Sequence, residues 1–299
     1  MDIATEKLHS NAIGLDSRPI SEIASLLLNN QIIAANSVQK TLPHIESGAH
    51  IMAHTLQLGG RLIYAAAGSS ALMALADALE LGGTFGIEPN SIQILMAGGI
   101  PTNAEMPGDT EDDISPLAEE LKDLSSNDTL IAVSASGNTP YTLQAAKIAN
   151  HKGARVLVIT NNPNSALEAI SDCAICLETP PEVISGSTRM GAGTAQKLAL
   201  NTLSTLMAFE LGHIHDGMMV NLKADNAKLR MRANAMVQTI AQVSQDKAEE
   251  ALKASGDNVK VATLLSSGIT SKEAATDLLQ QAQGHLRVAL QQIKKDNHT

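Results

Sequence analysis

The sequence predicts an α/β protein: a three-layer α-β-α sandwich around a central parallel sheet of about five strands, with N-terminal helices and a small C-terminal helical appendage. In the middle of the chain, apolar runs of strand length alternate with segments of helical periodicity. The strand-like runs are apolar almost throughout, as in parallel sheets that helices cover on both faces. The 299 residues, 44% of them apolar, are enough for a large core.

The alternation runs from residue 61 to residue 179. The expected strands are residues 61–68, 91–99, 129–137, 154–163 and 174–179. The segments between them predict helices over residues 69–83, 113–124, 139–153 and 164–173. Strands joined by helices in this way pair in parallel through right-handed crossover connections.

Helices are also expected on both sides of this region. The helical stretches are residues 17–42, 43–60, 197–214, 221–254 and 270–295, the last broken at Gln283–Gly284. Ser21 is expected to cap the first of them. We therefore expect residues 1–58 to pack as helices on a core of residues 59–222, and residues 223–299 to form a C-terminal helical region.

Charge and hydropathy exclude several classes of function. The net charge is −10, and no basic stripe is present, which argues against a nucleic-acid partner. No apolar run reaches the 18 to 20 residues or so that a membrane span needs. The first ten residues have neither the basic nor the apolar region of a signal peptide, so a cytoplasmic protein is expected.

The two cysteines, Cys173 and Cys176, form a CxxC pair in a predicted strand. Residues three apart on a strand point to opposite faces, so the pair is not arranged to share a disulfide or a metal. Two ligands alone also do not make a zinc site. We expect buried thiols, and neither a metal nor another cofactor.

Hydroxyl-rich loops follow two of the expected strands. Ser69 and Ser70 follow the first strand, and "SASGNT" (134–139) follows the third, each directly before a helix. In an open parallel sheet ligands bind beyond the carboxyl ends of the strands, and a helix start attracts anions. Helix capping is the alternative, but a cap needs one hydroxyl, whereas 134–139 supplies three. The loops therefore predict a phosphate site.

The pattern S-x-S-G-x-T at 134–139 resembles the phosphosugar-binding loop of the sugar isomerase (SIS) domain. By that resemblance Ser134, Ser136, Gly137 and Thr139 hold the phosphate of a sugar phosphate. "TEKLHSNAIGLD", "LELGGTFG", "SGSTRMGAGTAQKLALNTLST" and "NAKLRMRA" then resemble the N-acetylmuramic acid 6-phosphate etherase family, which is related to the glucokinase regulatory protein. The resemblance adds Ser187, Thr188 and Arg189 to the binding residues.

The resemblance also implies the chemistry. The family removes D-lactate from carbon 3 of the sugar by elimination and then adds water, giving N-acetylglucosamine 6-phosphate, in amino-sugar metabolism and cell-wall recycling. The family's two glutamates match Glu80 and Glu111, with Glu80 as the acid and Glu111 as the base. The alternatives are a solvated helix-end carboxylate for Glu80 and first-turn helix charge for Glu111. SIS-domain proteins are typically dimers, so a homodimer is expected.

The chain departs from the family pattern in three loops. Leu72, Asn138 and Gly191 stand where the family has basic residues. The hydroxyls for the phosphate are kept, so we expect any loss of affinity to fall on the second anion, the lactyl carboxylate, or on ion pairs around the site. The basic groups left as candidates are Arg189, Lys197, His213 and His215.

Two other functions stay open at this point. A phosphosugar isomerase would use Glu182 as its base, although Glu182 could instead cap the following helix. A non-catalytic sugar-phosphate sensor is also possible, but it would have no need of two glutamates. His213 and His215 lack an evident third metal ligand other than Asp216, which favours an interaction with a helix C-terminus.

Overall fold

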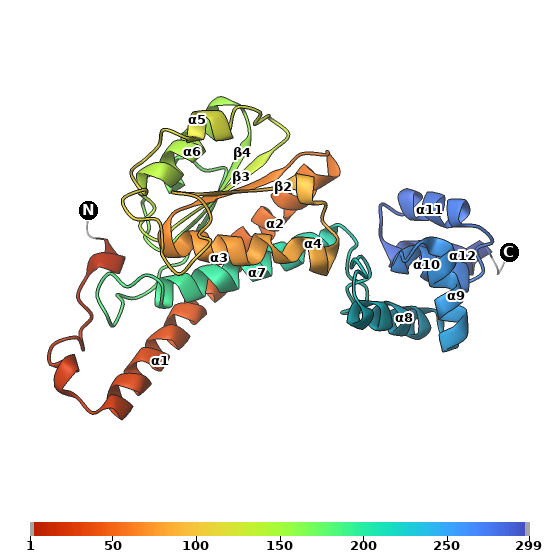
Figure 1. The fold of residues 1–299 in the computed structure, drawn as a ribbon, viewed down its shortest axis with the longest axis horizontal. Helices are drawn as coiled ribbons and strands as arrows, with labels where there is room; N and C mark the ends of the chain where they lie inside the picture. Colours follow the sequence, from red (N-terminus) through yellow and green to blue (C-terminus); the bar gives the residue numbers. More distant parts are fainter. Residues whose placement is uncertain (1–2, 297–299) are drawn as a thin grey trace. The chain divides into compact units, whose positions relative to one another are not determined.

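The computed structural model describes residues 3–296, and these divide into two compact units (Figure 1). The first contains the chain up to Ala78 together with Asn90–Leu206. The second contains Leu79–Pro89 and the chain from Met207 onward. Each unit is described by itself.

The first unit is built on a five-stranded sheet in the order β2-β1-β3-β4-β5, and every pair of neighbours is parallel. The strands are β1 Leu62–Ala66, β2 Ile92–Met96, β3 Thr129–Ser134, β4 Arg155–Thr160 and β5 Cys173–Cys176. All of β1 and β3 is buried, as the apolar runs predicted. The five-stranded parallel sheet is confirmed.

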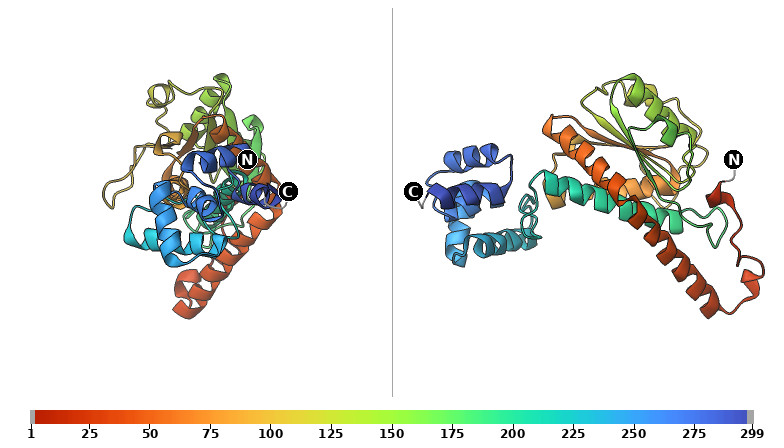
Figure 2. Two further views of the ribbon diagram at one scale, coloured as in Figure 1. Left: turned by 90° about the vertical axis from the view of Figure 1, so that its right-hand side faces the viewer. Right: turned by 180° about the vertical axis from the view of Figure 1, so that it is seen from behind.

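Helices cover both faces of the sheet (Figures 1 and 2). The helices of this unit are α1 Ile20–Ser37, α2 Leu42–Gln57, α3 Gly68–Ala78, α5 Leu117–Glu120, α6 Pro140–His151 and α7 Gly191–Glu210, the last of which continues past Leu206. Ile63 and Leu130 lie in one core with Ala145 of α6. On the other face, Gly48 of α2 lies so close to Leu157 that an added Cβ would be 2.7 Å from its Cδ1. This is the predicted three-layer sandwich.

Several element boundaries differ from those expected. Pro19, not Ser21, occupies the N-cap of α1. The helix expected over 113–124 is reduced to α5, because Asp113 holds the amide and hydroxyl of Ser115 in a turn. The helix expected over 164–173 is reduced to the 3-10 turn Glu168–Ile170. There the Glu168 carboxylate accepts from the Asn164 amide and the Thr160 hydroxyl, which stabilises a loop instead.

The second unit is helical. Its helices are α4 Glu80–Phe85, α8 Ala227–Ala241, α9 Gln245–Ser255, α10 Val259–Ser266, α11 Lys272–Gln281 and α12 Leu286–Asp296. The helix expected over 221–254 is divided, because Gln242 adopts a left-handed conformation (φ 55°) that ends α8. The predicted break at Gln283–Gly284 is confirmed by positive φ at both residues.

The domain boundaries expected at residues 58 and 222 stay a prediction; the compact units meet at residues 78/79, 89/90 and 206/207. Residues 79–89 belong to the helical unit, where the Asn221 side chain donates to the Phe85 carbonyl at 2.9 Å. Gly86 (φ 66°) lies against the Asn221 backbone, where a Cβ would be 2.2 Å from the carbonyl oxygen. Among the described helices, none combines the length and the apolarity that crossing a membrane requires.

A buried carboxyl joins three elements of the first unit. Asp77 of α3 is 1% exposed and accepts hydrogen bonds from Tyr64 of β1 (3.2 Å) and from Asn201 and Ser204 of α7 (3.0 Å each). Burial raises the pKa of Asp77 to about 6, although Ser204, the charge of Lys197 and the other two donors oppose the rise. The sheet and two covering helices are therefore held together by one titrating group.

This network predicts a pH-dependent stability. Because the pKa of Asp77 is higher in the folded protein than in the unfolded chain, its contribution to stability is full below about pH 4 and is lost as the pH rises through about 6. The melting temperature of the wild type minus that of Asp77→Asn should therefore increase as the pH falls from 7.5 to 5, by the equivalent of roughly 1–3 kcal/mol. Thermal melts of both proteins across this range measure it, and a constant difference would contradict it.

Candidate functional site

The loops after β1 and β3 meet at the point where the strand order reverses. The chain passes from β1 to β2 on one side and then to β3 on the other, so β1 and β3 are neighbours. Parallel sheets of this order bind ligands at this switch point, beyond the carboxyl ends of the strands. The two hydroxyl-rich loops predicted to hold phosphate are the ones that lie there.

The hydroxyls of the second loop converge on one another. Ser134 Oγ lies 2.9 Å from Thr139 Oγ1 and 3.4 Å from Ser136 Oγ. Thr139 occupies the N-cap of α6, but in the described structure its hydroxyl bonds to Ser134 and not to an amide of the helix. Capping therefore does not account for the three hydroxyls, and their cluster stands at the positive end of a twelve-residue helix.

Gly137 gives this loop its shape. Its φ is 69°, and its amide donates to Ser134 Oγ at 3.1 Å. A Cβ at this position would lie 2.3 Å from the Cβ of Ser165, closer than real contacts allow. Only glycine fits here without moving the loop.

Glu111 is held beside both loops. Its carbonyl accepts the amide hydrogen of Tyr141 in the first turn of α6, at 3.0 Å. Its carboxylate reaches Gly68, the first residue of α3, where a Cβ would lie 2.7 Å from Glu111 Oε1. Ser69 is half-buried and Ser70 buried in the same first turn of α3. The structure thus brings Glu111 together with both helix starts, and first-turn helix charge does not describe it.

Glu80 belongs to the second compact unit, whereas Glu111 belongs to the first. The helix expected over 69–83 is broken at Leu79, and Glu80 opens the short helix α4 of the second unit. Its side chain is exposed. Its pairing with Glu111 stays a prediction.

Glu182 has a structural role that the sequence left open. It is 1% exposed, and its two carboxylate oxygens accept from the amides of Gly191 (3.0 Å) and Ala192 (2.9 Å). These amides open α7, so Glu182 caps this helix, which begins six residues before the expected start at Lys197. The capping alternative is confirmed.

The loop before α7 carries Ser187, Thr188 and Arg189. Ser187 and Thr188 are half-buried in a turn in which the Gly193 amide donates to the Thr188 carbonyl at 2.8 Å, and Arg189 is exposed. The loop lies beside the N-terminal segment, because a Cβ on Gly186 would be 3.8 Å from Glu6 Oε2. Their role in binding stays a prediction.

Of the two thiols expected to be buried, Cys173 is buried and Cys176 is half-buried. Burial lowers the pKa of His213 to about 4, so the ring is neutral and does not act as a charge at the helix end, and burial also lowers the pKa of His215. Burial raises the pKa of both thiols, that of Cys176 to about 12. Residues 3–296 contain no group of three or more His, Cys, Asp or Glu side chains placed to hold a metal.

Asn162, a residue that supports the hydroxyl-rich loop 134–139, was not identified from the sequence. Asn162, after β4, donates to the Ala135 carbonyl (2.9 Å) and the Thr5 hydroxyl (3.0 Å) and accepts from the Ala4 amide (2.7 Å). It therefore joins the loop to the N-terminal segment. The signal was present: "TEKLHSNAIGLD" was part of the family pattern, but no role could be given to its threonine.

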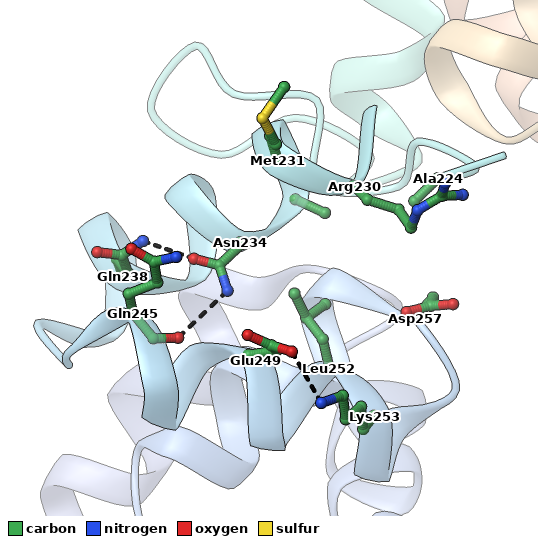
Figure 3. Close-up of a pocket in the computed structure, with 11 residues that line it drawn as sticks. Ala224, Arg230, Met231, Asn234, Gln238, Gln245, Glu249, Leu252, Lys253 and Asp257 are labelled. Atoms are coloured by element: carbon green, nitrogen blue, oxygen red, sulfur yellow. Dashed lines mark hydrogen bonds and ion pairs between the residues drawn. The ribbon is translucent and has the colours of Figure 1, made fainter. Parts of the chain in front are cut away.

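A hollow of about 480 Å³ lies in the second unit, between α8 and α9 (Figure 3). Several of its residues bond to one another: Gln238 to Asn234, Asn234 to the Gln245 carbonyl, and Lys253 to Glu249. None of the residues that line it was predicted as a site residue.

The family model of the SIS domain matches residues 29–161, a range that contains the hydroxyl-rich loop 134–139. Two solved structures share the fold. One is a protein of E. coli CFT073 in complex with a ligand (TM-score 0.52, 14% identity, 66% of this chain and 94% of that one). The other is a putative phosphosugar isomerase of Bacteroides fragilis (TM-score 0.50, 22% identity, 64% and 90%).

Sequence relatives narrow the class. The N-acetylmuramic acid 6-phosphate etherase of Deinococcus radiodurans is 38% identical over 289 residues, which cover 96% of this chain and 94% of the relative. The etherases of Oceanobacillus iheyensis (35% identical, 95% and 98%) and Bacillus subtilis (34%, 97% and 96%) match at similar length. The chain belongs to the N-acetylmuramic acid 6-phosphate etherase family.

The shape of the phosphate loop can be tested at Gly137. Gly137→Ala adds both backbone strain and a clash with Ser165, whereas Gly59→Ala adds only the strain, because Gly59 has φ 75° and nothing within 4 Å. We expect Gly137→Ala to lower the free energy of unfolding by about 1–3 kcal/mol more than Gly59→Ala. We also expect it to weaken binding of N-acetylglucosamine 6-phosphate at least tenfold. Denaturant melts and calorimetric titrations of both variants measure this, and equal effects would rule out the clash.

Proposed function

We propose that this protein is a carbon–oxygen lyase that cleaves the D-lactyl ether of N-acetylmuramic acid 6-phosphate, giving N-acetylglucosamine 6-phosphate and D-lactate. The observation that carries the proposal is the position of the Glu111 carboxylate beside Gly68, at the edge where the hydroxyl loop and two helix starts meet. The near full-length similarity to etherases supports the same conclusion.

In the proposed reaction the phosphate binds the hydroxyls of Ser134, Ser136 and Thr139, with Ser69 and Ser70 at the neighbouring helix start. The sugar reacts in its open-chain form, in which the aldehyde makes the proton on carbon 2 acidic. Glu111 removes that proton as the base, and the bond from carbon 3 to the lactyl oxygen breaks as Glu80 protonates the leaving group. Water then adds to carbon 3 of the conjugated double bond, and the proton returns to carbon 2.

The structure supports this proposal over the isomerase alternative. An isomerase would need Glu182 free to move protons, but both of its carboxylate oxygens are engaged by the amides that open α7. A sensor would bind the sugar phosphate without releasing lactate, so the assay of the reaction separates that alternative. We also propose that the protein is located in the cytoplasm and takes part in cell-wall recycling.

Neutral groups replace the three basic ones around the site. The Asn138 side chain donates to the Ser136 carbonyl (3.0 Å) and accepts from the Ala166 amide (3.1 Å), so it braces the loop. The positive charge of Lys197 interacts with Asp77 and lowers the pKa of that carboxyl group. Among the basic side chains named as candidates, Arg189 is exposed. We propose that Arg189 pairs with the lactyl carboxylate in place of the missing basic groups.

Removing either glutamate tests the chemistry. We expect Glu111→Gln and Glu80→Gln each to reduce D-lactate release from N-acetylmuramic acid 6-phosphate by about 10²–10⁴-fold, because each loses a proton-transfer group. Glu46→Gln, which changes an exposed carboxylate on α2, should keep the wild-type rate. A full rate in Glu111→Gln would refute its role. Binding without lactate release by the wild type would establish a sensor.

The homodimer is also a proposal, and α1 supplies its surface. Ile20, Ala24, Leu28 and Ile32 recur every four residues and form one stripe along the helix. Leu28 is 62% and Ile32 51% exposed, and the first half of α1 stands away from the sheet (Figures 1 and 2). An exposed apolar stripe of this kind is the surface that a second copy of α1 would cover.

A charge on the stripe should separate the subunits. We expect Leu28→Asp to raise the dimer dissociation constant at least a hundredfold, because it places a carboxylate in an apolar contact. Asn29→Asp adds the same charge to the next exposed position, off the stripe, and should remain dimeric. Light scattering after size exclusion gives the mass of each. A dimeric Leu28→Asp, or a monomeric wild type, would exclude this interface.

A further inference from the structure

A pocket of about 620 Å³ opens at the carboxyl ends of β3, β4 and β5 and shares residues with the phosphate loop. Ser136 and Asn138 of that loop form one wall, Thr179 and Pro180 after β5 another, and Ile3 of the N-terminal segment a third. This volume is within the range of small-molecule sites. A ligand whose phosphate lies on the loop would have this pocket beside it.

Three of the asparagine side chains that line the pocket already form hydrogen bonds within the protein. Asn138 is bonded through both its oxygen and its nitrogen within the loop region. Asn161 donates to the Leu177 carbonyl (3.3 Å) and accepts from Gln196 (2.9 Å). Asn162 is bonded to Ala135 and Thr5. These amides hold the strand ends in place and have little hydrogen-bonding capacity left for a ligand.

Thr179 is different. It is 4% exposed, lines the pocket, and its hydroxyl has no hydrogen-bond partner among the described residues. A buried hydroxyl without a partner is unfavourable by about 1–3 kcal/mol, so such groups in native proteins call for an explanation. A ligand that places a hydrogen-bonding atom at Thr179 Oγ1 provides one.

The charge of the pocket narrows the ligand group. Glu178 is the charged side chain among the described residues that line it, and none of them is Lys, Arg or His. A second anionic group in the pocket, in addition to the phosphate on the loop, would therefore meet repulsion from Glu178. Ile3, Ile33, Pro163 and Pro180 supply apolar surface. A small neutral group with one polar atom and a methyl group fits this lining.

We propose that this pocket holds the acetamido group of the substrate, with the Thr179 hydroxyl donating to the acetyl carbonyl and apolar side chains contacting the methyl. The inference rests on the proposed function, because it takes an N-acetylated sugar phosphate as the ligand. It makes Thr179 a specificity residue: the site discriminates the N-acetyl sugar from the free amine, since the ammonium group has no acceptor atom for the Thr179 hydroxyl and leaves it unpaired.

The test measures binding, so it does not depend on turnover. Dissociation constants are determined by calorimetry for N-acetylglucosamine 6-phosphate and glucosamine 6-phosphate, with the wild type, Thr179→Val and Thr179→Ser. We expect the wild type to prefer the acetylated ligand at least tenfold. Thr179→Val should weaken that ligand about tenfold and leave the amine nearly unchanged, whereas Thr179→Ser should keep the preference.

Thr142→Val is the matched control. Thr142 is also buried with an unpartnered hydroxyl in the described structure, but it is not among the residues that line the pocket. It should leave both constants unchanged. No preference in the wild type, or equal weakening of both ligands by Thr179→Val, would overturn the assignment. If Thr179→Val fails to fold, Thr179→Ala also removes the hydroxyl and should weaken the acetylated ligand in the same way. Absence of lactate release with the preference intact would refute the etherase activity and not the pocket.

Discussion

The hydrogen bond from the Tyr141 amide to the Glu111 carbonyl is the constraint on which the site depends. Its donor is in the first turn of α6, directly after the hydroxyl loop, and its acceptor belongs to the long connection between β2 and β3. Tyr141 is itself fixed, because its ring is buried in the core and its hydroxyl donates to Glu120 at 3.1 Å. The connection therefore cannot move away from α6 without disturbing the core. Glu111 owes its place beside Gly68 to this anchor.

Much of the fold could be predicted, because strand burial is written in consecutive residues. Val133 and Ile159 are apolar in long apolar runs, and such runs identify buried parallel strands without further information. The hydroxyl loop was also visible, since its spacing is local. The order of the strands was not predicted; the structure gives it, and the position of the loop at the switch point follows from that order.

What the sequence did not reveal depends on contacts between distant residues. The start of α7 at Gly191 depends on the carboxylate of Glu182, and the loop at 164–173 depends on that of Glu168. Neither acid differs in sequence from one that is simply solvated. Asp77 reads as one more polar position on a helix, yet it is buried under Tyr64 and Ser204. Helical periodicity cannot identify a carboxylate that caps a helix, or one that stabilises a loop where a helix was expected.

The Ser134–Thr139 cluster has a consequence for how the protein responds to its medium. In the proposed function this loop holds a phosphate through hydroxyls, amides and a helix end, and its six residues contain no lysine or arginine. Ionic strength screens interactions between full charges far more than it affects short hydrogen bonds. The affinity of this loop for a phosphate should therefore vary little between dilute buffer and concentrated salt. Recognition of this kind selects a phosphate by its shape and acceptor atoms, and it leaves the protein's net charge of −10 free to serve solubility.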